Sequence, residues 1–119
     1  MSHIVDWATL AYSATPQVIG YIGSSNPIYR QYFSGTSSTN ENTTTTISTS
    51  GTASILGISA MEKSQYNNWW SLPNLHSESI YKAYLFVDNI TNTGFKINIQ
   101  NGTAMRGQTY RGLVDYYLA

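Results

Sequence analysis

The sequence predicts an all-β fold, an antiparallel β-sandwich of about seven or eight strands. Three observations lead to this prediction. Residues 95–100 alternate strictly between apolar and polar side chains, which is the period of a half-buried strand. Residues 81–87 are rich in aromatic and β-branched side chains, which favour strands, and lead into a turn region. Apart from a short helix expected at residues 5–12, no segment keeps a helical period over three turns.

The first two predicted strands form a hairpin. Within residues 17–33, two apolar and aromatic-rich runs flank Gly23-Ser24-Ser25-Asn26-Pro27, a cluster of residues that favour turns. We therefore expect a β-hairpin with a loop of about five residues.

The remaining strands are predicted from composition. Residues 55–61 are apolar on both faces and indicate a central strand. After a turn at residues 40–42, the Thr-rich residues 43–50 indicate a polar strand at an edge or facing a water-filled axis, with a flexible loop as the alternative. Residues 110–118 form the last strand, in which Gly112 indicates a bulge or a close approach of the backbone.

Composition limits the classes of function. The chain has 119 residues, enough for one domain. We divide it into an N-terminal segment (1–14), which is either a short helix or a link to a shaft or attachment part, and a β-sandwich head domain (15–119). Six basic and six acidic residues give a net charge of zero, so we expect no binding to nucleic acid. No stretch predicts a signal peptide or membrane insertion, and the absence of cysteine excludes disulfides.

Few residues suggest catalysis, and we expect no enzyme activity. The histidines are His3 and His76, no nucleophile-elbow pattern is present, and the six acidic residues are scattered. Asp88, Asn89 and Asn92 offer oxygen ligands for calcium but include only one carboxylate. We therefore expect no metal site and no cofactor.

A polar and aromatic segment, residues 65–76, is the predicted binding region. Aromatic faces stack on the C–H surfaces of sugars, while amides and hydroxyls bind sugar hydroxyl groups. Adjacent strand residues point to opposite faces, so two neighbouring tryptophans cannot both be buried in a half-exposed sheet. One of them is expected at a ligand site or a subunit interface. The candidate ligand-binding residues are Tyr66, Asn67, Asn68, Trp69 and Trp70.

Arg111 and Asp115 lie on the same face of the last predicted strand. This placement favours an ion pair within the strand or between subunits. A contact between Arg111 and an anionic ligand is the alternative.

Both ends of the chain resemble a known family. The segments Gln17-Val18-Ile19-Gly20 and Pro27-Ile28-Tyr29-Arg30, with Tyr12-Ser13 upstream, resemble the EQVIGTWIDGKPIYRK opening of a small β domain near the ends of bacteriophage tail-fibre and other appendage proteins. Residues 110–119 resemble its closing strands. Ser24-Ser25-Asn26 stands where the family usually has Asp-Gly-Lys. The resemblance implies a β-sandwich and a homotrimer around a threefold axis.

The C-terminal third also resembles the end of H-type lectin domains, which are trimeric β-sandwiches that bind sugars. The similarity lies in residues 88–95 and in the final Tyr117-Leu118-Ala119. The residues alone predict a turn of Asn and Thr, a positive φ at Gly94, and entry of Phe95 into the core.

The residues and the two resemblances lead to one hypothesis. The chain is expected to be a non-catalytic head domain of a phage virion appendage, a tail fibre or head fibre, that contacts the host surface through a polysaccharide. Its expected partners are two further copies of itself, a host cell-surface glycan and other virion proteins, with a location in the virion and outside the host after lysis. The alternative is a structural trimeric attachment or decoration module that binds no host ligand.

Overall fold

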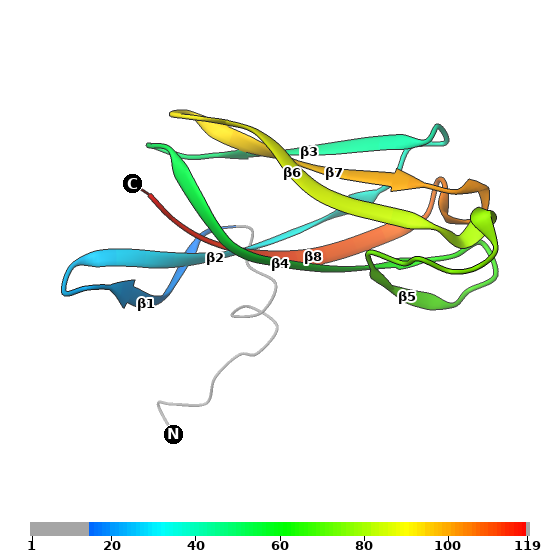
Figure 1. Ribbon diagram of the computed structural model, residues 1–119, viewed down its shortest axis with the longest axis horizontal. Helices are drawn as coiled ribbons and strands as arrows, with labels where there is room; N and C mark the ends of the chain where they lie inside the picture. The colour runs from blue at the N-terminus through cyan, green and yellow to red at the C-terminus, as the bar shows by residue number, and fades with distance from the viewer. Residues whose placement is uncertain (1–14, 119) are drawn as a thin grey trace, which may run out of the picture.

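The computed structural model describes residues 15–118, which form two antiparallel β-sheets packed face to face (Figure 1). Within these residues there are eight strands, two 3-10 turns and no α-helix, so the predicted all-β sandwich is confirmed. The helix expected at residues 5–12, and the rest of the N-terminal segment, lie outside the described residues. The elements are β1 (Gln17–Ile22), β2 (Asn26–Thr36), β3 (Asn42–Ser48), β4 (Ala53–Lys63), β5 (Trp69–Leu72), η1 (Ser79–Tyr81), β6 (Ala83–Thr91), β7 (Gly94–Asn101), η2 (Thr103–Met105) and β8 (Thr109–Leu118).

The two sheets differ in size. The larger sheet has the strand order β1-β2-β8-β4-β5, and the smaller has the order β3-β7-β6. The chain crosses between the sheets after β2, β3, β5 and β7. Strand β8 occupies the middle of the larger sheet and pairs with β2 on one side and β4 on the other. Half of the strand pairs, β2–β8, β4–β8 and β3–β7, join segments that are distant in the sequence.

The core lies between the sheets and follows the predicted alternation. Phe95, Ile97 and Ile99 of β7 are each at most 2% exposed. Across the sandwich they meet β8, where the Phe95 ring packs edge-on against Tyr116 with centroids 5.4 Å apart. Gly94, the first residue of β7, has the expected positive φ, at 155°.

The predicted β1–β2 hairpin is present, with a tighter turn than expected. Asn26 and Pro27 already belong to β2, where they pair with Ile22 and Tyr21 of β1. The connection is therefore Gly23-Ser24-Ser25, with Gly23 in the left-handed region at φ 65°. The hairpin projects beyond the end of the smaller sheet (Figure 1).

Strands β3 and β4 also follow the sequence. The Thr-rich β3 lies at an edge of the smaller sheet, as predicted, and the Thr45 hydroxyl bonds to the Tyr110 hydroxyl at 2.7 Å. Strand β4 lies between β8 and β5, which confirms the central strand. An irregularity between Ile55 and Gly57 leaves Leu56 half exposed while Ile55 packs on the core.

The sequence suggested Arg111 as the ion-pair partner of Asp115, and this interpretation was wrong. The Asp115 carboxylate accepts two hydrogen bonds from Arg30 on β2, at 2.8 and 2.9 Å. Arg30 and Asp115 are direct cross-strand partners in the β2–β8 ladder, so their side chains meet on one face. The pair is bidentate, the strong geometry for an arginine and a carboxylate.

Candidate functional site

The β4–β5 connection presents the first candidate residue, Tyr66. The turn closes through Ser64, whose backbone N–H donates to the Asn68 carbonyl at 2.7 Å and whose carbonyl accepts the Asn67 N–H at 3.0 Å. Asn67 adopts a left-handed φ of 73°, which asparagine tolerates better than most residues. Asn67 and Asn68 therefore shape the turn with their backbones and leave Tyr66 projecting, 57% exposed.

Trp69 and Trp70 point to opposite faces of β5, as predicted. Trp69 is 41% exposed and lies on the outer face of the larger sheet. There it packs beside Arg111, whose guanidinium carbon is 4.6 Å from the tryptophan ring centroid. Trp70 is half buried and faces the other way. The two tryptophans therefore belong to different surfaces.

Four rings form a contiguous group at this end of the sandwich, which we call the aromatic cluster: Tyr66, Trp70, His76 and Tyr81. The Tyr81 ring centroid lies 5.1 Å from His76, 5.8 Å from Trp70 and 6.1 Å from Tyr66. Trp70 also meets His76 edge-on at 5.4 Å. These separations fall in the range of attractive aromatic pairs. The exposed Tyr66 thus packs against Tyr81, which in turn contacts Trp70 and His76.

Hydrogen bonds fix the loop that supplies His76 and Tyr81. Asn74 exchanges two backbone hydrogen bonds with Ala83, and its side-chain amide donates to the Tyr81 carbonyl at 2.7 Å. His76 accepts the Glu78 backbone N–H at Nδ1, at 3.0 Å. In the neutral ring this places the proton on Nε2. Burial, with smaller contributions from Tyr66 and Glu78, raises the pKa of Tyr81, so its hydroxyl stays protonated at neutral pH.

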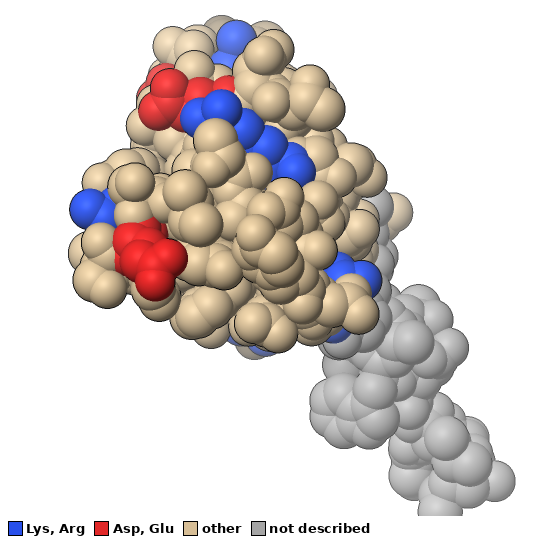
Figure 2. All heavy atoms as spheres, turned by 90° about the vertical axis from the view of Figure 1, so that its right-hand side faces the viewer, with Lys and Arg blue, Asp and Glu red and all other residues tan. Residues whose placement is uncertain are grey.

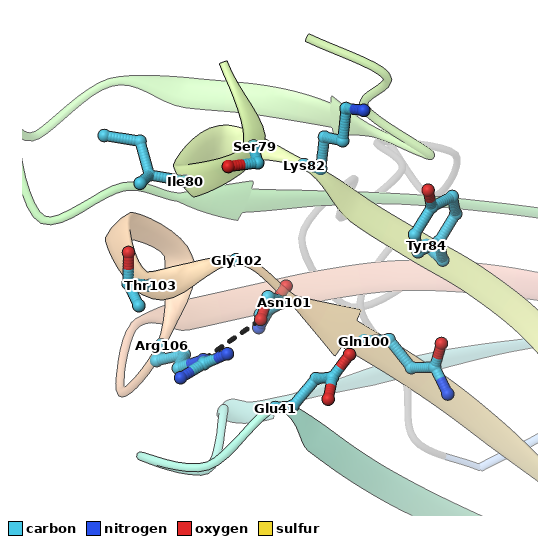
Figure 3. A pocket seen from close by; sticks show the side chains of 10 residues that line it. All are labelled: Glu41, Ser79, Ile80, Lys82, Tyr84, Gln100, Asn101, Gly102, Thr103 and Arg106. Atoms are coloured by element: carbon cyan, nitrogen blue, oxygen red, sulfur yellow. Dashed lines mark hydrogen bonds between the residues drawn. The ribbon is translucent and has the colours of Figure 1, made fainter. Parts of the chain in front are cut away.

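A hollow of about 350 Å³, which we call the polar cleft, opens at the same end of the sandwich. Figure 3 shows Ser79, Ile80 and Lys82 on one side, Arg106 and Glu41 on the other, and Gly102 between them. The two sides approach closely at Gly102, where a Cβ would lie 2.6 Å from the Ile80 carbonyl oxygen. Glu41 supplies the single carboxylate of the lining.

A buried polar pair lies behind this end. Glu62 of β4 is 0% exposed, and its Oε2 accepts a hydrogen bond from Asn101 Nδ2 at 3.1 Å. Glu62 Oε1 and Asn101 Oδ1 are both buried without a hydrogen-bond partner. Burial raises the pKa of Glu62 to about 7, against smaller opposing contributions from Ser37 and Asn101. Every second residue of a strand faces the same side, so Glu62 shares one face of β4 with Ile58 and Ala60. This spacing in the sequence was a signal that Glu62 is buried.

Charge is sparse at this end. Figure 2 shows mostly uncharged side chains, with a short row of basic groups beside acidic ones. Among residues 15–118, no three His, Asp or Glu side chains gather closely enough to hold a metal ion. The same range contains no helix long and apolar enough to span a membrane.

The structure brings together only part of the predicted site. Tyr66 and Trp70 share the aromatic cluster, whereas Trp69 lies on the outer face, and Asn67 and Asn68 lie in the turn between them. None of these five residues lines the polar cleft. The sequence placed His76 at the end of the predicted binding region but not among the candidate ligand residues, and it gave no sign of Tyr81, because their approach to Trp70 depends on the loop after β5.

Comparisons of the chain with protein-family models, with curated proteins and with solved structures found no match.

Proposed function

We propose that this chain is a non-catalytic head domain of a bacteriophage virion appendage, a tail fibre or head fibre, that contacts a polysaccharide on the host surface. The observation that carries the proposal is the aromatic cluster. Tyr66 is exposed at the tip of a hydrogen-bonded turn and packs against Tyr81, which contacts the other two rings of the cluster. The exposed amides of Asn67 and Asn68 stand next to it in the turn. Such a platform, with polar groups at its rim, suits a sugar ring.

The distribution of carboxylates supports a binding role without catalysis. Glycoside hydrolysis commonly requires two carboxylates across one cleft. Here the polar cleft is lined by one, Glu41. The Glu62 carboxyl is buried, and the Asp115 carboxylate is held by Arg30. The arrangement therefore favours recognition of a saccharide over its cleavage.

The first test replaces the exposed ring. We expect Tyr66→Ala to weaken binding to purified bacterial surface polysaccharides by about tenfold, because one stacking contact is lost. The measurement is biolayer interferometry on a panel of immobilised polysaccharides, of which the wild type should bind at least one. Tyr21→Ala is the matched control, since Tyr21 is 59% exposed at the other end of the molecule. Equal losses in both variants, or no binding by the wild type, would contradict the proposal.

A second candidate is a structural trimeric attachment or decoration module without a host ligand. The observation that favours it is the apolar character of two edge strands. On β1, Val18, Ile19, Tyr21 and Ile22 are between 43% and 59% exposed. The edge strand β6 carries the exposed side chains Tyr84, Phe86 and Ile90. Unpaired apolar edges are usually covered by a partner.

The oligomeric state tests this candidate. We expect light scattering to give a particle of three times the 13.2 kDa chain mass. Val18→Lys should shift the particle towards the monomer, because a charge on β1 opposes strand pairing. Thr44→Lys, at an exposed position of the polar edge strand β3, is the control and should leave the mass unchanged. A wild-type monomer would argue against a trimeric module.

A further inference from the structure

The polar cleft gathers a large share of the charged side chains of this chain. Glu41, Lys82 and Arg106 all line it, although the whole chain has six basic and six acidic residues. Its volume of about 350 Å³ lies within the range of small-molecule sites. Three charged groups at one hollow, in a chain with so few, make the polar cleft a candidate binding site separate from the aromatic cluster.

Main-chain hydrogen bonds at the end of β7 hold these three residues around the cleft. The Asn101 N–H donates to the Glu41 carbonyl at 2.8 Å, and the Gly102 N–H donates to the Lys82 carbonyl at 2.7 Å. The Asn101 carbonyl in turn accepts a hydrogen bond from Arg106 Nε at 3.0 Å. The charged residues come from three separate segments, before β3, before β6 and after η2, so only the folded chain brings them together.

The functional groups of these side chains remain open to a ligand. Among residues 15–118, the Glu41 carboxylate and the Lys82 ammonium group make no hydrogen bond and no ion pair. Arg106 uses only its Nε, and Figure 3 accordingly draws one hydrogen bond among the lining residues, from Arg106 to Asn101. This bond orients the guanidinium and leaves the donors on its two terminal nitrogens for a ligand.

Neutral groups add further donors and acceptors to the lining. Ser79 and Thr103 supply hydroxyl groups from the two sides of the cleft, and Gln100 supplies an amide (Figure 3). Gln100 pairs directly with Tyr84 across the β6–β7 ladder, so the Tyr84 ring, which is 46% exposed, stands beside that amide. This mixture suits a sugar ring, whose hydroxyl groups both donate and accept and whose C–H face is apolar.

The opposite charges of Arg106 and Glu41 favour a neutral sugar. The guanidinium donates to one hydroxyl group and the carboxylate accepts from another, and both hydrogen bonds are of the strong, charge-assisted kind. An anionic group would be attracted by Arg106 but repelled by Glu41, and the reverse holds for a cationic group. The Lys82 side chain points away from both of them (Figure 3).

The polar cleft adjoins the aromatic cluster through η1. Ser79 and Ile80 line the cleft, and the next residue, Tyr81, packs in the cluster. We infer that the polar cleft is a second saccharide subsite, which binds one neutral hexopyranose unit through Arg106 and Glu41 while the aromatic cluster stacks on another unit of the same polysaccharide. The inference rests on the proposed polysaccharide binding and adds a second recognition site to it.

The test uses NMR to locate small sugars on the protein. The probes are the methyl glycosides of glucose, galactose, mannose and N-acetylglucosamine, each titrated into isotope-labelled protein to about 50 mM, because one sugar unit is expected to bind with millimolar affinity. At least one of them should shift the backbone amide signals of Gly102, Thr103 and Arg106. Glu41→Gln should weaken this binding about tenfold, because a sugar hydroxyl loses its charged acceptor.

Arg106→Gln should weaken the binding to a similar extent, because it removes the guanidinium donors. Lys96→Gln is the matched control: it removes one charge from an exposed position on the smaller sheet, outside the cleft, and should leave the binding unchanged. Cleft signals that shift equally in the wild type, Glu41→Gln and Arg106→Gln would overturn the inference, since neither charged group would then hold the sugar.

The positions of the shifted signals separate this inference from the proposed function. Shifts confined to Tyr66, Asn67 and Trp70 would overturn the cleft subsite and leave polysaccharide binding at the aromatic cluster in place. The absence of shifts with every one of the sugars would also overturn the cleft subsite, and the panel of polysaccharides would then decide on the proposed function separately.

Discussion

Replacing Glu62 by glutamine should make the protein more stable above neutral pH and remove much of its pH dependence. In the folded chain, burial raises the pKa of Glu62 from an ordinary value of 4.5 to about 7. The Glu62 carboxyl group therefore binds its proton more tightly in the folded state than in the unfolded state. The contribution of the protonated Glu62 to the free energy of unfolding is complete below pH 4.5. It declines as the pH rises to about 7 and changes no further above that value.

The expected size of this effect is large for one side chain. A rise in pKa from 4.5 to about 7 on folding corresponds to about 3 kcal/mol of unfolding free energy. The amide in Glu62→Gln would be neutral at every pH and would place a donor where Glu62 Oε1 stands, in a site where Asn101 Oδ1 is buried without a hydrogen-bond partner. The residues that pair with Glu62 on the neighbouring strands are Trp70 of β5 and Tyr110 of β8. The charged Arg106 contacts the Asn101 carbonyl rather than Glu62.

The measurement is urea unfolding of the wild type and Glu62→Gln between pH 4.5 and 8.5. The difference between the two proteins isolates Glu62, because the rest of the sequence is identical in both. Glu41→Gln, at an exposed position, is the control and should follow the wild type closely. Parallel curves for the wild type and Glu62→Gln would show that Glu62 does not titrate in this range.

Gly112→Ala should destabilise the fold by about 3 kcal/mol or more, through overpacking at the centre of the larger sheet. A Cβ at this position would collide with the Ser59 carbonyl oxygen and would lie 2.5 Å from Phe33 Cζ and 2.9 Å from the Ala60 Cβ. The first neighbour is backbone of the paired strand β4 and the second belongs to a ring that is 4% exposed, so neither moves easily. Thermal unfolding measures the effect.

Gly57 offers the matched control, because it lies in β4 with nothing within 4 Å of a Cβ. Gly57→Ala should be neutral or slightly stabilising, since alanine reduces the freedom of the unfolded chain. Combining Gly112→Ala with Phe33→Leu should restore only part of the stability, because the Ser59 carbonyl remains in place. If Gly112→Ala were as stable as Gly57→Ala, the paired strands β4 and β8 would have more room to separate than their pairing indicates.

The sequence correctly predicted the features whose pattern lies within a few neighbouring residues of the chain. Alternation in β7 specified Phe95 and its neighbours as core, and the crowding at Gly112 followed from glycine inside a strand. The neighbouring tryptophans separated because adjacent strand residues face opposite ways. In each case the information lay within a few residues of the chain.

The predictions that failed depended on which strands are neighbours. Asp115 could be assigned to Arg111 along one strand, but its partner Arg30 lies across the β2–β8 ladder, a pairing that no local pattern reveals. For the same reason the sequence did not place Tyr81 in the candidate site, because Tyr81 reaches Trp70 only after the loop from β5 folds back. Arg111 was placed beside Trp69 by the pairing of β8 with β4 and of β4 with β5.

The central position of β8 also sets the order of events during synthesis. Translation delivers β2 and β4 before the strand that lies between them, so the nascent chain can form the β1–β2 and β4–β5 hairpins but cannot join them into one sheet. Pairings such as Ile28 with Tyr117 bridge most of the described chain, which is typical of slow folding. Until Leu118 has left the ribosome, the inner edges of β2 and β4 remain open to other chains. Folding of this domain therefore follows its translation, and these two edges are the surface that a chaperone on the nascent chain would have to shield.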